Sequence, residues 1–250
     1  IDPCIPLTVM TRKPQETRLL YGVRAIYTFN VPRFLRAVRR TQLFINGGGS
    51  LIQDSTSSRS LYYYLFTIWA ARHGGARVLM YGCGIGHVAR PFNRRLAKKV
   101  LDKNADVITL RDTISRRELS EMGITHPQVR SAADPALSLS PAPDEDACQY
   151  LRQHGLDPAG RYICFSVRPW KDFDRFAAFS QAADYAREKY GLETVFMPIE
   201  DPTDVEPSRR AAAGMKHESH LLPAPDRVEL TMAVLRRMKL MCAMRLHALV

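Results

Sequence analysis

Three consecutive glycines, Gly47, Gly48 and Gly49, form the first segment of the sequence that could do chemistry. They follow a short apolar run, and hydroxyl, acidic and basic residues come next: Ser50, Asp54, Ser57 and Arg59. Glycine packs no side chain and loses the most backbone entropy on folding, so such a run suits close approach of backbone N–H groups to a ligand. Ahead of a helix, it predicts a cradle for an anion or a phosphate. A tight strand-to-helix turn capped by serines is the simpler alternative.

A fixed cation is predicted near the middle of the chain. Arg168 follows an apolar strand-like run and is itself followed by Pro169 and Trp170. Proline limits the backbone, so the guanidinium would form a planar, pre-positioned fork for a carboxylate or a phosphate. A structural stack of the guanidinium on Trp170 is the alternative.

A second cation lies near the end of the sequence, next to an imidazole. Arg245 and His247 follow the run 240–244, and in an extended segment their side chains would point the same way. A fixed cation beside a titratable imidazole suits an anionic substrate that needs a proton. We therefore predict that Arg245 and His247 are catalytic, although a lone histidine can also be an ordinary interior residue.

Two more clusters follow predicted strands. The segment 82–87 approaches the dinucleotide fingerprint, but His87 stands where the third glycine belongs. We expect instead a glycine turn that includes Gly84 and lines a cleft, with His87 at its rim. Arg111 ends another strand, and it either contacts substrate or pairs with Asp112 while Ser115 caps the next helix.

The sequence predicts no metal site and no cofactor. Neither His-Glu-x-x-His, Cys-x-x-Cys nor Gly-x-Ser-x-Gly occurs. The five cysteines are scattered and odd in number, which favours a reducing cytoplasm over a disulfide framework.

Strand-like and helical patterns alternate along the chain. Strands are predicted at 7–10, 43–46, 77–81, 107–110, 129–132, 162–167, 194–198, near Leu221 and at 240–243, and helices at 31–40, 60–72, 91–103, 115–122, 145–154, 173–190 and 226–238. This alternation predicts an α/β protein with parallel, doubly wound sheets. Prolines at 141 and 143 mark a linker, so we expect two Rossmann-like domains, 1–140 and 141–250, with a ligand cleft between them.

Charge and hydropathy limit the classes of partner. The net charge of +11 resides largely in two basic helices, which are usually solvated but could face anionic substrates or anionic lipid. No nucleic-acid-binding motif occurs, so nucleic acid is not expected as a partner. No apolar run is long enough to span a membrane, and the first residues lack the pattern of a signal peptide. The sequence starts without methionine and stops inside an apolar run, so we expect that both native ends are missing.

Taken together, these clusters resemble the polysaccharide pyruvyl transferase family, in particular the bacterial enzymes that ketal-pyruvylate a secondary cell-wall polymer. The segments that carry the resemblance are 47–54 with 56–60 and the tyrosines 62–64, then 81–86, 109–112 with Ser115, 133–136, 167–170 and 244–249. They occur in order along nearly the whole chain. The Gly-Gly-Gly-Ser run and the terminal Arg-Leu-His-Ala-Leu are the most specific of them.

The resemblance implies a two-domain fold like that of GT-B glycosyltransferases. It implies phosphoenolpyruvate as the donor and a sugar diol as the acceptor. The expected location is cytoplasmic, where the basic helices could bring the protein to the inner face of the membrane. The acceptor would be N-acetylmannosamine of a lipid-linked precursor, and Arg168, Arg245 and His247 would serve the donor. The family's first strand, its second glycine-rich turn and the last part of its C-terminal domain are expected to be missing. Cys83 and His87 depart from the pattern, where glutamine and proline are common.

Other functions remain open at this stage. A nucleotide-sugar-dependent glycosyltransferase on the same fold would bind a nucleoside diphosphate sugar and ignore phosphoenolpyruvate. A non-catalytic glycan- or anion-binding module would bind without turnover, and a peripheral protein could use its basic helices at an anionic membrane.

Overall fold

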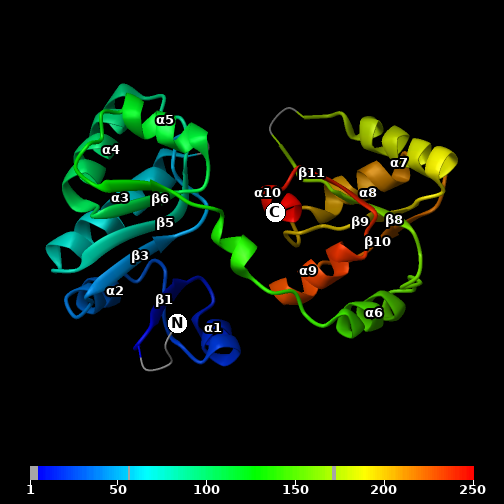
Figure 1. Cartoon of the computed structure of the whole chain (residues 1–250), viewed down its shortest axis with the longest axis horizontal. Coiled ribbons are helices and arrows are strands. Elements are labelled where there is room, and N and C mark those ends of the chain that lie inside the picture. Colours follow the sequence, from blue (N-terminus) through cyan, green and yellow to red (C-terminus); the bar gives the residue numbers. More distant parts are fainter. Residues whose placement is uncertain (1–4, 56, 171–172) are drawn as a thin grey trace. The chain divides into compact units, whose positions relative to one another are not determined.

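The computed structural model describes residues 5–55, 57–170 and 173–250, and the side chain of His247 lies outside this description. The described chain forms two compact units that divide between Pro135 and Ala136. Figure 1 shows that each unit contains a sheet with helices packed against it. The predicted α/β class with parallel sheets is confirmed.

The main sheet of the first unit is parallel and has the strand order β3-β5-β6-β7. Its strands are β3 (Leu43–Gly47), β5 (Arg77–Ile85), β6 (Val107–Leu110) and β7 (Gln128–Ser131), and β4 (Ser50–Ile52) pairs with the far end of β5. The helices are α2 (Val31–Val38), α3 (Ser58–His73), α4 (Pro91–Asn104) and α5 (Thr113–Glu121). Their apolar faces and the strands form one core that includes Leu61, Ile68, Met80, Leu101 and Ile108.

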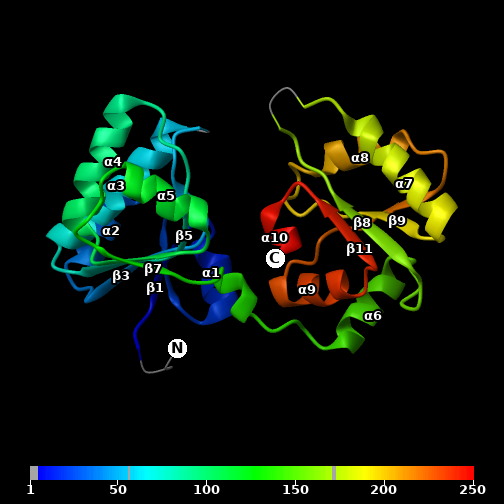
Figure 2. The same ribbon diagram turned by 45° about the horizontal axis from the view of Figure 1, so that its top comes forward.

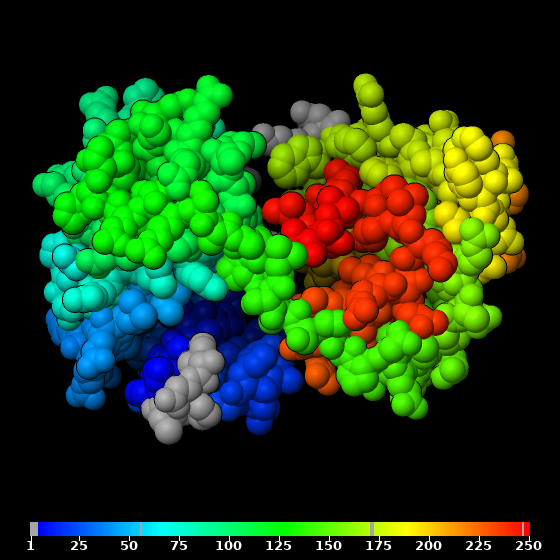
Figure 3. Space-filling model, viewed as in Figure 1, coloured from blue at the N-terminus to red at the C-terminus, as the bar shows by residue number. Residues whose placement is uncertain are grey.

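A smaller sheet precedes the main one. β1 (Thr8–Thr11) and β2 (Arg24–Tyr27) pair in parallel and are joined by α1 (Pro14–Tyr21). A cavity of about 2270 Å³ lies between this pair and β3, and residues of all three strands line it. Figure 3 shows the surface of this unit hollowed beside the dark-blue N-terminal residues. In the described part of the chain, the first unit therefore has two separate parallel sheets.

The second unit has one continuous parallel sheet in the order β10-β9-β8-β11. Its strands are β8 (Tyr162–Ser166), β9 (Glu193–Phe196), β10 (Ser219–Leu221) and β11 (Leu240–Ala243). The helices are α6 (Asp144–Gln153), α7 (Phe176–Tyr190), α8 (Val205–Ala213), α9 (Val228–Arg236) and the short α10 (Leu246–Leu249), and a 3₁₀ turn spans Pro135–Ser138.

Helices cover both faces of this second sheet, as Figure 2 shows. Tyr162 and Cys164 of β8 pack in one buried cluster with α6 and α9. Ile163 and Phe165 pack in another with α7 and α8. Successive residues of a strand point to opposite faces, so the apolar run of β8 supplies both cores.

The structure confirms every predicted strand and helix to within a few residues at its ends, and it adds others that were not predicted. The additions are α1, β2, β4, α8 and α10. α1 buries none of its residues, and its large apolar side chains, Leu19, Leu20 and Tyr21, are consecutive rather than spaced at helical intervals, so its sequence has no helical pattern. Among the described residues, no helix is both long and apolar enough to cross a membrane.

Candidate functional site

The three glycines connect two strands, because the unpredicted β4 lies between them and the helix expected at 60–72. Gly47 ends β3, Gly48 and Gly49 have φ of 64° and 73°, and β4 starts at Ser50. Gly48 N–H donates to Tyr81 O at 2.9 Å, and Gly84 N–H donates to Gly49 O at 2.8 Å. β3 pairs with the first part of β5 and β4 with its last part, so the turn carries the chain from one part of β5 to the other. α3 begins only at Ser58, where the Ser57 hydroxyl accepts from Arg59 N–H at 3.1 Å.

The predicted glycine turn at 82–87 is also wrong over most of its length, because β5 continues to Ile85. Gly84 in this strand allows a close approach between neighbouring segments. A Cβ there would lie 2.8 Å from Ser50 Oγ and 3.3 Å from Arg111 Nη2. Gly84 therefore brings Ser50 and Arg111 together at the carboxyl end of the first sheet.

Arg111 forms a shielded ion pair at this end of the sheet. Its Nη1 lies 2.7 Å from Asp134 Oδ2, and the two side chains are 8% and 12% exposed. Its Nη2 donates to Ser50 Oγ at 3.4 Å. The predicted pairing with Asp112 does not form, because Asp112 caps α5 by accepting from Ser115 N–H at 2.7 Å. Ser115, predicted as that cap, accepts instead from Ile85 N–H at 2.7 Å.

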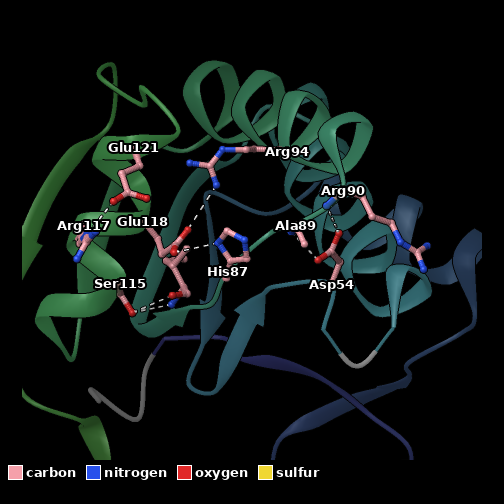
Figure 4. Close-up of polar contacts among 10 residues, drawn as sticks. Asp54, His87, Ala89, Arg90, Arg94, Ser115, Arg117, Glu118 and Glu121 are labelled. Carbon is pink, nitrogen blue, oxygen red and sulfur yellow. Dashed lines mark hydrogen bonds and ion pairs between the residues drawn. The ribbon is translucent and has the colours of Figure 1, made fainter.

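Asp54 binds the backbone that leads into α4 (Pro91–Asn104). Its carboxylate accepts from the backbone N–H groups of Ala89 and Arg90 at 2.9 and 3.1 Å, and from Asn93 Nδ2 at 2.8 Å. Burial acts to raise the pKa of Asp54, but these hydrogen bonds and the nearby Arg90 outweigh it and lower the pKa. Figure 4 shows Asp54 facing the start of α4. The structure therefore gives Asp54 the function of holding the segment before α4 in place, in addition to any contact with substrate.

His87 and Arg59 have surroundings different from those of the Arg111 pair. His87 Nδ1 is 3.2 Å from Glu118 Oε1, and Arg94 Nη1 reaches the other oxygen of Glu118 at 3.5 Å (Figure 4). The His87 side chain is two-thirds exposed. Arg59 is exposed on the first turn of α3 and lines the large cavity with Gly47. The structure therefore brings Ser50, Gly84 and Arg111 together, while His87 pairs with Glu118 and Arg59 lines the cavity.

Arg168 occupies the carboxyl edge of the second sheet, two residues after β8. Its guanidinium carbon stacks over Trp170 at 5.1 Å from the ring centroid. Its Nε is buried and has no hydrogen-bond partner among the described residues, and the same holds for Ser166 Oγ at the end of β8. An unpartnered buried donor is costly, so these atoms mark a place where a ligand acceptor would be favourable.

Arg245 leaves the same edge of the sheet from the neighbouring strand. Ser166 of β8 is in register with Ala243 of β11, and Met244 N–H donates to Ser166 O at 2.9 Å. Arg168 and Arg245 thus each follow one of two adjacent strands by two residues. The prediction that residues 245–247 are extended is wrong, because α10 begins at Leu246 directly after Arg245.

The charge of Arg245 is already matched by two carboxylates. Its Nε and Nη2 bind Asp204 at 2.8 and 2.5 Å, and Nη2 also lies 2.7 Å from Glu200 Oε2. The Asp204 side chain is fully buried. The hydrogen bonds to Asp204, followed by the charges of Asp204 and Glu200, raise the pKa of Arg245 against the effect of burial. His247 is at the second position of α10, and its side chain lies outside the described residues.

Asp204, Glu200 and Asn46 are residues that the sequence analysis did not single out. The polar stretch that follows β9 was the available signal for the two acids. Asn46 directly precedes the glycines, and its buried Nδ2 has no partner among the described residues. In the described chain, no three His, Cys, Asp or Glu side chains gather where they could hold a metal ion. Burial raises the pKa of Cys83 to about 12, so this thiol is not an activated nucleophile.

The two units together define a parallel α/β protein of the GT-B type, with Rossmann-like sheets. The chain belongs to the polysaccharide pyruvyl transferase family, whose model matches residues 3–250. No curated protein matches the sequence.

Two solved structures show the same fold at low sequence identity. One is Anabaena Alr3699/HepE in complex with UDP-glucose, with a TM-score of 0.55, 10% identity, and coverage of 90% of this chain and 62% of that one. The other is UDP-GlcNAc 2-epimerase from Neisseria meningitidis bound to UDP-GlcNAc, with a TM-score of 0.58, 12% identity, and coverage of 96% and 69%. The chain thus spans less than two thirds of the length of the first of these proteins.

Proposed function

We propose that the protein transfers a pyruvyl group from phosphoenolpyruvate to two hydroxyls of one sugar, and so forms a cyclic ketal. Membership of the polysaccharide pyruvyl transferase family supports a transferase that acts on a glycan. The proposed acceptor is N-acetylmannosamine of a lipid-linked cell-wall precursor. The main support for phosphoenolpyruvate as the donor is Arg168, a cation at the carboxyl edge of the second sheet. Its buried Nε has no partner among the described residues.

The reaction needs two carbon–oxygen bonds and one proton transfer to carbon. A sugar hydroxyl adds to C2 of phosphoenolpyruvate while C3 takes up a proton and becomes a methyl group. A second hydroxyl of the same sugar then attacks C2, loses its proton and displaces inorganic phosphate. The site must hold a carboxylate and a phosphate, and it must supply an acid near C3.

Arg168 is the proposed partner of the donor's anionic groups. Its guanidinium is fixed by the stack on Trp170, and a planar fork can bind a carboxylate or a phosphate through two parallel hydrogen bonds. Ser166 Oγ, buried at the end of the same strand, can add a further hydrogen bond. Such charge-assisted contacts stabilise the leaving phosphate without a metal ion.

His247 is the proposed acid, and Arg245 its proposed positioning residue. Arg245 is held by Asp204 and Glu200 immediately before α10, which carries His247. This ion-pair cluster fixes the start of the helix relative to the strand ends. We expect His247→Gln to retain donor binding and to lower turnover by about 10²–10⁴-fold, the range of general acid catalysis.

The residues of the first unit are proposed to bind substrate at the carboxyl edge of their own sheet. Gly84 allows Ser50 to approach Arg111, and Gly47, Gly48 and Gly49 form the turn that leads to Ser50. Asn46 directly precedes this turn, and its buried Nδ2 has no partner among the described residues. An amide and a hydroxyl suit the hydroxyl groups of a sugar, which favours the acceptor for this edge.

The deciding experiment measures phosphate release from phosphoenolpyruvate with and without a lipid-linked N-acetylmannosamine acceptor, and identifies the ketal by mass and NMR. We expect release that depends on the acceptor, and solvent deuterium in the product methyl group. The solved structures that share the fold are bound to UDP-glucose and UDP-GlcNAc, so UDP-sugars are tested in parallel. Sugar transfer from UDP with no use of phosphoenolpyruvate would establish the glycosyltransferase instead. Binding of a glycan without turnover of either donor would indicate a binding module.

A further inference from the structure

An aromatic and basic groove on the first unit lies outside the proposed site. It runs between α3 and α4, which lie side by side (Figure 2), and it encloses about 740 Å³. We call it the α3–α4 groove, and its principal residues are Tyr62, Phe66, Trp69, Leu96, Lys99 and Lys103.

The apolar part of the groove is a stripe of aromatic side chains. Tyr62, Phe66 and Trp69 recur at helical spacing along α3, so they share one face. The rings of Phe66 and Trp69 are 6.3 Å apart, and Trp69 stacks on His73 at 4.6 Å. Trp69 remains 44% exposed, and Phe92 at the start of α4 is 65% exposed. An exposed tryptophan beside other apolar side chains indicates a contact surface, since water solvates such a patch poorly.

The basic residues of α4 divide between two environments. Arg94 pairs with Glu118 of α5, and Arg90 donates to Ser58. Lys99 and Lys103 instead line the groove and are exposed, and among the described residues no carboxylate pairs with either. Two acids in this part of the chain have other partners: Asp102 of α4 accepts from Thr125 N–H and His126 N–H, and Asp106 is bound to Arg72 at 3.0 Å. The groove therefore carries uncompensated positive charge along one rim.

We propose that the α3–α4 groove docks on an anionic lipid surface. Tryptophan and tyrosine favour the boundary between headgroups and acyl chains, because their rings are apolar and their N–H or O–H groups are polar. Lysines on the rim bury their methylenes and keep their ammonium groups among anionic headgroups. The combination of aromatic stripe and unpaired lysines matches a peripheral helix that lies at the interface without crossing it. The groove would place the first unit at the surface that holds a lipid-linked acceptor.

The test compares two variants that lose the same charge. Three proteins are sedimented with vesicles. They are the full chain, a lysine pair (Lys99→Gln with Lys103→Gln), and an arginine pair on the exposed face of α2 (Arg33→Gln with Arg36→Gln). One set of vesicles is phosphatidylcholine alone, and the other contains added phosphatidylserine. We expect the full chain to bind only the anionic vesicles. The lysine pair should weaken that binding by about 30-fold, since each basic residue near the surface adds about fivefold. The arginine pair should change it by less than about threefold, because charges away from the surface are screened.

The fluorescence of Trp69 tests directly whether the α3–α4 groove faces the lipid surface. The sequence has two tryptophans, so Trp170→Phe leaves Trp69 as the single emitter. Its emission should shift to shorter wavelength on anionic vesicles and become shielded from iodide. Absence of binding, equal binding to neutral vesicles, an equal loss in the arginine pair, or unchanged Trp69 emission on binding would each overturn the proposal.

Discussion

The arginines at the carboxyl edges of the two sheets differ in whether an acidic side chain pairs with them. In the first unit, Arg111 is shielded and paired with Asp134. In the second unit, Arg168 makes no ion pair among the described residues and keeps a buried Nε without an acceptor. Removal of one member of a shielded ion pair leaves the other charge uncompensated and destabilises the fold, whereas an arginine without an acidic partner is available to a ligand. Position at a strand end is therefore not sufficient to identify a binding arginine. Its function depends on whether an acidic side chain already pairs with it.

The largest expected effect on stability is at the paired arginine. Arg111→Ala leaves Asp134 shielded without its ion-pair partner, so we expect the free energy of unfolding to fall by about 3–5 kcal/mol. Urea unfolding measures the change, and amide exchange in β5 and β6 assigns it to the first unit. Arg117→Ala is the control, because its ion pair with Glu121 is exposed and should matter far less. A small change for Arg111→Ala would remove the distinction between the two edges.

The glycine turn should give the next largest effect. Gly48 has a left-handed φ of 64° although the space around it is open, so Gly48→Ala is strained by its backbone alone. We expect a loss of about 1–2 kcal/mol in stability. Gly47→Ala is the matched control, because Gly47 lacks a positive φ and its Cβ would meet only Ile45 at 4.0 Å. Equal effects in the two variants on thermal unfolding would contradict the assigned turn.

Asp54 provides a test through pH. Asp54→Ala removes the acceptor for Ala89 N–H, Arg90 N–H and the Asn93 side chain, and it should cost about 1 kcal/mol at neutral pH. The pKa of Asp54 is lower in the folded protein than its ordinary value of 3.8. Its contribution is therefore present above that value and is lost as the pH falls through the folded pKa. Unfolding curves of variant and parent should converge in acid, and a gap that persists at the lowest pH would show that these hydrogen bonds do not depend on the ionised carboxylate.

Arg168→Ala should have the smallest effect on stability. The substitution relieves the cost of burying Nε without a partner, and it loses the stack of the guanidinium on Trp170. These two contributions to the free energy of unfolding nearly cancel. We expect the free energy of unfolding to change by less than about 0.5 kcal/mol, measured as for Arg111→Ala. A loss as large as that at Arg111 would make Arg168 a structural residue.

The sequence predicts the strands better than the contacts at their ends. The apolar run of β8 identifies a fully buried strand, so the position of Arg168 after it follows directly. The partner of Arg111 does not follow, because Asp134 is distant in sequence and meets it only once β6 and β7 pair. Asp204 was missed for a similar reason, since its contact with Arg245 joins the start of α8 to the end of β11. The short α10 has too few residues for a periodic pattern, and the expected extended path at 245–247 was therefore wrong.

The most direct test of the central claim is the affinity of phosphoenolpyruvate for the parent protein, Arg168→Ala and Arg168→Lys, measured by calorimetry. We predict that the parent binds and that Arg168→Ala binds about 10- to 150-fold more weakly, which corresponds to the ~1.5–3 kcal/mol of a charge-assisted contact. Arg168→Lys should recover part of the loss, because it restores the charge without the fork. Affinity unchanged in Arg168→Ala, or no binding of phosphoenolpyruvate by the parent, would contradict the account.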